Sequence, residues 1–565
     1  MVLDHLRNAG RFSGEGLNLL WRGIGRPARG LARLRSRAPE RLLISPQDIR
    51  TADPTVAADI YAGYFAFAGK MANTHGKSPF EIEPASPAWA AALAGFGWLR
   101  HLRAADTALA RANARALVED WLALSPRNPA LPAREPRVAA RRLMSWLSQS
   151  PMILDGADRD FYQRFMKAIG RLVAFLQGAR GDGARGEDRL FVAIALAEAG
   201  ICTAGMGGLQ RRSTQLLATE LTRQILADGG HAGRNPQTLL DLLLDLLPLR
   251  QAYAHRGVAP PGELLNAIDR MLPMLRLLRL GDGSLALFNG MGATQPDVIA
   301  TVLAHGDARA AAPVNAPYSG YQRLEAGGSV LVMDTGAPPP WEFSGRAHAG
   351  QLSFELSVDG QRLVGNCGAP DETRAALREA ARATAAHSTL VVADTSSSRF
   401  APASGLSKCL GGRVIAGVRR TTMERSDGAT GHVVAASHDG YVARFGLVHE
   451  RTLQLSGDGG RLAGWDRLIA SGKPPKGVAS PDFTLRFHLH PAIIARKSED
   501  SLSVSLQTPD GAAWFFHAGG YPLELEPGIY FAVPDGARRA SQIVINANAG
   551  HTPGVDWVFE RAGAA

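Results

Sequence analysis

The sequence predicts a protein of two parts, a helical N-terminal half followed by a C-terminal half of antiparallel β-sheet. Apolar residues recur at helical spacing from about residue 85 to about residue 280. From Tyr318 onward they form short alternating or β-branched runs separated by Gly, Asp and Ser. A chain of 565 residues is also too long for one hydrophobic core. We therefore expect a basic tail over 1–50, a helical domain over 51–310 and a β-sandwich domain over 315–565.

The helical half is predicted from apolar stretches joined by short breakers such as Ser125-Pro126, Gly229-Gly230 and Pro260-Pro261. Helices of this length with short connections form an antiparallel array. Periodicity alone leaves open whether the array is a toroid or an open solenoid. The predicted helices cover 98–124, 138–147, 161–176, 190–201, 216–226, 239–249 and 264–280.

The C-terminal half contains many short runs with strand character and frequent turn residues, a pattern typical of a β-sandwich. The segment from Asp371 to Ala386 is an exception, because it is rich in Ala and Arg and is expected to be a loop with a helical turn. The expected strands include 329–333, 352–358, 433–436, 441–445, 483–490 and 501–506.

The net charge of +10 is unevenly distributed. Within residues 1–41, nine arginines stand against three acidic residues, which gives +6 and leaves +4 for the other 524 residues. Such a tail is either solvated or in contact with anionic lipid headgroups at a membrane surface. The arginines are Arg7, Arg11, Arg22, Arg26, Arg29, Arg33, Arg35, Arg37 and Arg41.

Several classes of protein are excluded by what the sequence lacks. No apolar run is long enough for a transmembrane helix, and the N-terminus lacks the apolar core of a secretory signal. The three cysteines, Cys202, Cys367 and Cys409, cannot form a disulfide framework or a thiolate zinc site. No phosphate-binding loop or dinucleotide fingerprint occurs in a suitable context, and we expect no nucleic-acid partner.

Two histidines in the β half could share a ligand. His348 begins one expected strand, Asn366 follows another, and His387 precedes a third. Three adjacent strands can bring two imidazoles and one side-chain oxygen together, a set that can hold zinc. The alternative is that both histidines are buried and hydrogen-bonded. His488 and His490 also point to one side of a strand, as a second metal pair or as a solvated or sandwich-facing pair.

The stretch from Arg346 to Thr389 resembles the C-terminal domain of the heparinase II/III family, with its pattern His-x-His-x-Asp, Asp-x-Gly and Ala-His-Asn-Thr. The resemblance implies a structural zinc or related cation at His348, Asn366 and His387, and no other cofactor. Arg346, Gly350 and Asn366 stand where the family pattern has His, Asp and Asp. Further matches are Tyr441, His449-Glu-Arg451 and Gly464-Trp-Asp466.

The helical half is similar to the α/α-toroid of the same family, so the resemblance implies a toroid followed by a β-sandwich. The run from Asp228-Gly-Gly-His231 to Arg234-Asn-Pro236 resembles the family loop Asp-Gly-Gly-x-x-x-Arg-x-Pro. The family's catalytic Tyr falls on Thr238. Its Asn-His pair falls near Asp188-Arg189, so neither catalytic residue type is at its usual place.

A uronate lyase neutralises the substrate carboxylate, removes the adjacent proton and protonates the leaving oxygen. Arg189, Arg234 and Arg346 are candidates for the first task, because a guanidinium binds a carboxylate through two parallel hydrogen bonds. His231 is the candidate acid or base, since histidine titrates near neutral pH. The alternatives are surface ion pairs for each arginine and a helix-capping role for His231.

The leading hypothesis is a lyase that cleaves an acidic, uronate-containing glycan, such as a glycosaminoglycan or alginate, by β-elimination in the interdomain cleft. The alternative is a glycan-binding or polysaccharide-assembly accessory protein of the same fold. A glycoside hydrolase is a third option, and it requires Glu187, Asp188, Asp241 and Asp245 to converge. The family suggests the cell envelope or periplasm. The absence of a signal peptide suggests the cytoplasm or the inner membrane surface instead.

Overall fold

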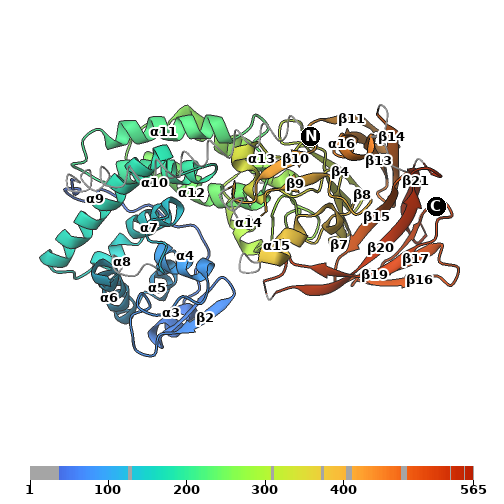
Figure 1. The fold of residues 1–565 in the computed structure, drawn as a ribbon. Helices are drawn as coiled ribbons and strands as arrows, with labels where there is room; N and C mark the ends of the chain where they lie inside the picture. Colours follow the sequence, from blue (N-terminus) through green and yellow to red (C-terminus); the bar gives the residue numbers. More distant parts are fainter. Residues whose placement is uncertain are drawn as a thin grey trace.

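In a computed structural model of the chain, a helical half and a β-sheet half lie side by side (Figure 1). The structure describes residues 37–124, 130–182, 184–306, 311–370, 375–402, 410–471, 480–534, 536–552 and 554–563. The last helix before the sandwich is α14 (Pro296–Leu303), and the first strand after it is β3 (Asn315–Ala316). No helix within these ranges is long and apolar enough to cross a membrane.

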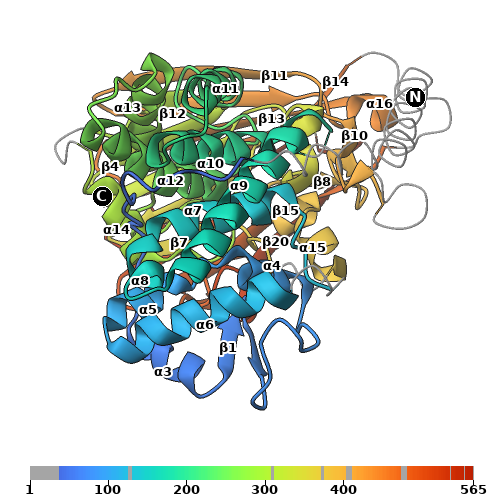
Figure 2. The same ribbon diagram turned by 90° about the vertical axis from the view of Figure 1, so that its left-hand side faces the viewer.

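The N-terminal half is a curved layer of helices, seen from its outer side in Figure 2. It also contains one hairpin that the sequence analysis did not predict. Its turn residues Ala68 and Gly69 both have positive φ, as a tight two-residue hairpin turn requires. The elements are α3 (Thr55–Tyr61), β1 (Tyr64–Phe67), β2 (Lys70–Asn73), α4 (Pro87–Gly95), α5 (Leu99–Ala105), α6 (Ala108–Leu124), α7 (Pro136–Ser148), α8 (Ser150–Leu154), α9 (Arg159–Asp182), α10 (Asp188–Cys202), α11 (Leu209–Gln224), α12 (Pro236–His255) and α13 (Gly262–Leu277).

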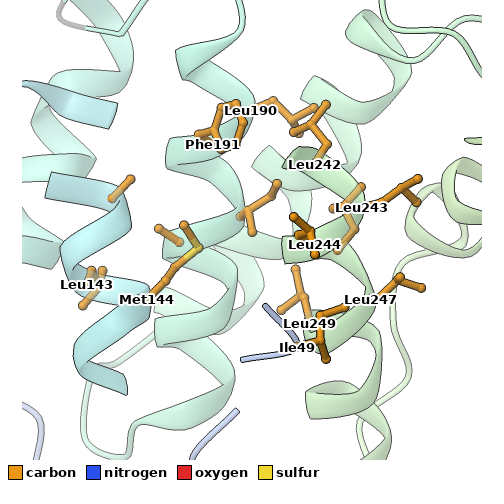
Figure 3. Packing of buried hydrophobic residues seen from close by; sticks show 14 of the residues in the cluster. Ile49, Leu143, Met144, Leu190, Phe191, Leu242, Leu243, Leu244, Leu247 and Leu249 are labelled. Atoms are coloured by element: carbon orange, nitrogen blue, oxygen red, sulfur yellow. The ribbon is translucent and has the colours of Figure 1, made fainter. Parts of the chain in front are cut away.

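Helix α10 lies in the middle of this layer, against α7, α11 and α12. Leu190 and Phe191 of α10 pack between the apolar faces of α7 and α12 (Figure 3). Helix α12 begins at Asn235-Pro236, where the Asn235 side chain accepts a hydrogen bond from the backbone N–H of Gln237 at 2.8 Å. Removal of this apolar surface from water is the main stabilising contribution, at roughly 25 cal/mol per Å².

Residues 37–50, which the sequence analysis assigned to the basic tail, pack against the helical half. The backbone N–H of Leu43 donates to the carbonyl of Cys202 at 2.7 Å. Ile49 joins the apolar core (Figure 3), and Arg50 forms an ion pair with buried Asp245 at 2.7 Å. The arginines from Arg7 to Arg35 lie outside the described residues.

The C-terminal half consists of two large antiparallel sheets, which confirms the predicted fold class. One sheet has the order β11-β12-β13-β14-β21-β18-β17-β16, and the other β19-β20-β15-β7-β6-β5-β4-β3, with β8 paired to β15. The strands are β4 (Tyr321–Ala326), β5 (Ser329–Asp334), β6 (Phe354–Val358), β7 (Gln361–Gly365), β8 (Leu390–Val392), β11 (Thr421–Gly428), β12 (Gly431–His438), β13 (Leu447–Ser456), β14 (Arg461–Ala470), β15 (Asp482–Leu489), β16 (Ile494–Lys497), β17 (Ser503–Gln507), β18 (Ala513–His517), β19 (Glu524–Tyr530), β20 (Arg538–Asn548) and β21 (Gly554–Arg561).

The β half also contains short elements outside the two large sheets: η2 (Trp341–Arg346), α15 (Ala375–Ala381), η3 (Thr384–Ala386), β9 (Ser398–Phe400) and β10 (Val414–Gly417). The predicted strand at 441–445 is wrong, because Val442–Phe445 forms the short helix α16. Gly446 ends this helix in the left-handed conformation, which glycine adopts at low cost. Helix α15 and η3 provide the helical turn predicted between Asp371 and Ala386, of which 371–374 lie outside the described residues.

A buried ion pair lies within the first of these sheets, and its arginine also contacts segments next to the second. Arg451 on β13 binds both carboxylate oxygens of Asp466 on β14, at 2.8 and 2.9 Å, and also donates to the carbonyls of Leu352 and Ser388. Trp557 donates to the same carboxylate at 2.8 Å. Removal of one partner from such a pair leaves an uncompensated buried charge. The motif residues His449, Arg451 and Asp466 therefore belong to the interior of the sandwich.

Candidate functional site at the domain junction

The loop from Asp228 to Asn235 fastens the helical half to the first strands of the sandwich. The Asp228 carboxylate accepts hydrogen bonds from the backbone N–H groups of Tyr318 and Ser319 at 2.8 and 2.6 Å. Gly229 has φ +87°, and a Cβ there would lie 2.1 Å from the carbonyl oxygen of Arg270. Only glycine fits this close approach. The Asp-Gly-Gly motif is therefore explained by the junction itself.

Arg234, predicted to bind the substrate carboxylate, is buried and bonded within the protein. It forms an ion pair with Asp334 of β5. It also donates to the backbone carbonyls of Ser319, Gly320, Gly336 and Ala337. These contacts use all of the guanidinium's donors. The structure thus gives Arg234 a junction-stabilising position and leaves it no donor for a substrate.

His231, predicted to move a proton, is also buried. Its Nδ1 accepts from the backbone N–H of Gly233 at 2.9 Å, so its Nε2 carries the proton and donates to Gln224 Oε1 at 3.1 Å. Burial lowers the pKa of His231 to about 4, and nearby Glu187 offsets only part of this effect. The imidazole is therefore neutral, and its ring-nitrogen lone pair is already used in a hydrogen bond. The ring packs edge-on against the ring of Phe343, with 5.6 Å between the ring centres.

Glu187, which precedes α10, is the centre of a charge network where the resemblance places the family's catalytic residues. Its carboxylate lies 3.0 Å from Arg137 Nη1 and 3.9 Å from Arg346 Nε, and it accepts from Thr238 Oγ1 at 2.9 Å. Burial alone would raise the pKa of Glu187, but Arg137 and Arg346 outweigh burial and lower it to about 2. Glu187 is therefore ionised at neutral pH.

Arg137, on α7, gathers two more carboxylates into this network. Asp188 and Asp241 lie 3.6 and 3.5 Å from its guanidinium. Burial raises the pKa of Asp188, and Arg137 offsets this only in part. Three of the four carboxylates considered for a hydrolase thus converge. The fourth, Asp245, instead pairs with Arg141 at 2.7 Å and with Arg50.

Arg189, the other predicted carboxylate ligand, is bound to α11. Its Nε donates to the buried carboxylate of Glu220 at 2.8 Å. The other oxygen of Glu220 accepts from Gln224 Nε2 at 3.0 Å. Because Gln224 also contacts His231, Arg189 and His231 belong to one network that joins α10, α11 and the Asp-Gly-Gly loop.

His348 and His387 lie together, as the sequence analysis expected. His387 Nδ1 donates to the carbonyl of Ala383 at 2.8 Å, which leaves Nε2 as an acceptor for His348 Nδ1 at 3.1 Å. Burial lowers the pKa of His387 to about 4, and burial and His387 lower the pKa of His348 well below its usual value. The pair is neutral and hydrogen-bonded at neutral pH.

The third predicted cation ligand, Asn366, is buried beside this pair. Its Oδ1 accepts from the backbone N–H of Ser388 at 2.9 Å, and its Nδ2 has no hydrogen-bond partner among the described residues. A Cβ on Gly350 would lie 2.6 Å from His387 Cδ2, so the family's Asp cannot stand there without moving the ring. No group of three His, Cys, Asp or Glu side chains in the described chain could hold a metal ion. In the described residues, this place therefore offers two imidazoles and a neutral amide, without a third His, Cys, Asp or Glu ligand.

The pair His488 and His490 does not form a metal site either. His488 Nε2 donates to the carbonyl of Ala385 at 2.9 Å, and its Nδ1 lies 3.6 Å from Cys367 Sγ. The His490 ring packs edge-on against Tyr530 at 5.1 Å. Both histidines are thus packed within the sandwich half.

A pocket of about 1110 Å³ lies beside the Glu187 network on the β side of the junction. Arg346 connects the two, because it lines the pocket and contacts Glu187. Four arginines and one glutamate give the charged lining a net charge of +3: Arg346, Arg378, Arg382, Arg399 and Glu379. The sequence analysis predicted only Arg346 of these. It also missed Arg137, because arginines on separate helices and turns carry no motif that predicts their meeting.

This fold, with an arginine-rich junction between an α/α-toroid and an antiparallel β-sandwich, defines the class of polysaccharide lyase-like proteins. The family described as "Heparinase II/III-like, C-terminal" matches residues 308–558. The chain is 32% identical over 519 residues to FtsZ-localized protein C of Caulobacter vibrioides, which covers 90% of this chain and 88% of that protein. The chain belongs to the heparinase II/III family.

Solved structures agree with this fold. A mutant of the heparan sulfate lyase HepC from Pedobacter heparinus matches with a TM-score of 0.63 at 16% identity, over 95% of this chain and 88% of that one. A structure of heparinase III matches with a TM-score of 0.66 at 14% identity, over 86% of this chain and 79% of that one. Because the sequence identities are so low, these matches establish the fold and nothing more.

Proposed function

We propose that this protein binds an anionic glycan in the junction pocket and does not cleave it by β-elimination. The observation that carries the proposal is the Glu187 network. Three carboxylates and Arg137 fill the place where the resemblance puts the lyase residues. A lyase needs a base of near-neutral pKa there. Glu187 is a weak base with a pKa of about 2, and the Nδ1 lone pair of His231 is already bonded.

The pocket supports binding of an acidic sugar. Its positive lining suits carboxylate or sulfate groups, since guanidinium groups bind such anions through paired hydrogen bonds. Its volume is slightly above the range of about 300–1,000 Å³ typical of pockets that bind small ligands. The HepC and heparinase III relatives are named for heparin-type polysaccharides, which are acidic. The alternative of the sequence analysis, an accessory protein of the same fold, thus has more support than the lyase.

The test is to incubate the full chain with a panel of uronate polymers and sulfated glycosaminoglycans. Three quantities are measured: ultraviolet absorbance of unsaturated product, release of reducing ends, and binding by calorimetry. We expect binding without either product, and weaker binding by Arg346→Gln. Arg496→Gln, an exposed arginine on β16 outside the pocket, is the control. Rising absorbance would restore the lyase hypothesis, and reducing ends without absorbance would indicate a hydrolase built on the clustered carboxylates.

We further propose that the protein acts where FtsZ assembles, on the cytoplasmic side of the inner membrane. This rests on the name of the relative, FtsZ-localized protein C, and on the basic tail of the sequence. The arginines of the tail would contact anionic lipid headgroups, each contributing about 1 kcal/mol near the surface. Imaging of a fluorescent fusion together with FtsZ tests the location, and a diffuse signal during division would argue against it.

A further inference from the structure

Arg382 is a buried arginine without a carboxylate partner in the described part of the chain. It is 6% exposed. Its Nε donates to the carbonyl of Ala347 at 2.7 Å and its Nη2 to that of Ser344 at 3.4 Å. Its guanidinium carbon lies 3.8 Å from the centre of the Phe400 ring. A buried guanidinium held only by carbonyls and an aromatic face keeps an uncompensated positive charge.

The remaining donor of Arg382 is directed to the pocket. Its Nη1 forms no hydrogen bond with any residue that the structure describes. A Cβ at Gly412 would lie 2.7 Å from Nη1, and both Gly412 and Arg382 line the pocket. The absence of a side chain at position 412 therefore leaves the space beside Nη1 open. Nε and Nη2 are thus fixed by backbone carbonyls, while Nη1 faces the pocket and can donate to an anion there.

Two more arginines line the same pocket. Arg378 on α15 and Arg399 on β9 are both exposed. Burial and then the neighbouring charge of Arg378 lower the pKa of Arg382 to about 10, and Glu379 offsets only part of this effect. Glu379 is the one acidic side chain in the lining. Like charges held together in this way are relieved by an anion of more than one charge.

We propose that Arg378, Arg382 and Arg399 form a subsite for a doubly charged phosphoryl group, such as the phosphate of a phosphorylated or diphosphate-linked sugar. This deepens the proposed glycan-binding function and rests on it. A tetrahedral phosphoryl dianion offers acceptors in several directions, so it can bind three arginines from different elements. A carboxylate has one charge and two oxygens in a plane, which suits a single guanidinium. The rest of the pocket has room for the attached sugar.

The experiment is calorimetric titration of the full chain at constant ionic strength with pyrophosphate, inorganic phosphate, sulfate and acetate. The double variant Arg378→Gln/Arg399→Gln changes two exposed side chains and should fold. Arg382→Lys keeps the positive charge and removes the planar guanidinium with its paired N–H donors. Arg496→Gln is the matched control. We expect one pyrophosphate per chain, an affinity at least about tenfold lower for the double variant, and an unchanged affinity for the control. Acetate should not compete.

The proposal is overturned if phosphate and pyrophosphate give no binding at millimolar concentration, or if the control variant loses as much affinity as the double variant. Competition by acetate equal to that by sulfate would also overturn it. Binding of uronate polymers without binding of phosphate would reject the subsite and keep the proposed function. Binding of phosphate without binding of uronate polymers would reject the proposed function and keep the anion subsite. Titration with UDP-N-acetylglucosamine distinguishes a sugar-linked phosphate from a free phosphate as the ligand. Tighter binding than pyrophosphate indicates a sugar-linked phosphate, and equal or weaker binding indicates a free one.

Discussion

Arg346 Nε lies 3.9 Å from Glu187 Oε1, across the junction between the helical half and the β half. Arg346 stands where the family pattern has a histidine, and Glu187 is next to the family's Asn-His position. Residues from two distant segments therefore form one ion pair where the resemblance places the lyase residues. Arg137 and then Arg346 hold Glu187 ionised, and Arg346 connects the network to the junction pocket.

Replacing His231 by Ala should lower stability and leave glycan binding unchanged. The change leaves Gln224 Oε1 and the Gly233 N–H without their partner, at a cost of about 1–3 kcal/mol for a buried unsatisfied group. Urea unfolding measures the stability, and calorimetry measures the binding. If a lyase activity is found and this variant loses it at full stability, His231 is a proton-transfer residue after all.

Replacing Arg234 by Met should destabilise the junction more strongly. Asp334 would remain buried without its partner, and breaking such a pair costs about 3–5 kcal/mol. The double variant Arg234→Met/Asp334→Asn should be less destabilised than the sum of the single changes. Urea unfolding measures the stability loss of the single and double variants, with Arg496→Met as the control. A cost near that of the control would show that the ion pair contributes little.

Stability should fall as the pH is lowered from 6.5 to about 4. Burial lowers the pKa of His387 from 6.5 to about 4. In this window the unfolded chain binds a proton at this residue and the folded chain does not. The free energy of unfolding therefore decreases by up to about 3 kcal/mol from His387 alone. His387→Gln should have a shallower pH dependence than wild type, with exposed His551→Gln as control. Equal slopes for all three would contradict the assignment.

Zinc should stabilise Asn366→Asp but not the natural sequence. The new carboxylate would be buried beside the two imidazoles, so without metal the variant should be less stable by about 1–3 kcal/mol. With zinc, the two histidines and the aspartate would supply three ligands of the type the metal prefers. Thermal unfolding with zinc and with chelator measures this. A lower melting temperature of the wild-type protein in chelator would show that the natural site holds a cation.

Removal of residues 1–36 should abolish binding to anionic vesicles and leave the fold intact. The contacts of Leu43 with Cys202 and of Arg50 with Asp245 lie after the deletion. Binding of the full chain to phosphatidylserine vesicles should weaken with salt, because the attraction is screened within about 8–10 Å. Vesicle sedimentation measures it, with phosphatidylcholine vesicles as control. Equal binding by the truncated chain would place the membrane contact elsewhere.

Local patterns in the sequence determined the fold class and the element types. Helical spacing predicted α6, α7 and the helices from α9 to α13, and alternating runs predicted strands such as β5, β6 and β15. The exception at 441–445 shows the limit of a five-residue pattern. Burial of Tyr441 and a left-handed Gly446 turned it into a helix. The resemblance also singled out His348 and His387, although both lie in loops, before β6 and β8, and His348 does not begin a strand as expected.

The roles of the charged residues were decided by the tertiary structure. Arg234, Arg189 and His231 were predicted to meet substrate from their motifs, yet Asp334, Glu220 and Gln224 bind them within the protein. Arg137, Arg378, Arg382 and Arg399 carry no motif at all. The charge state and availability of a side chain depend on its burial and on partners distant in sequence. A local pattern specifies neither, so only the folded chain shows which arginines remain available for a ligand.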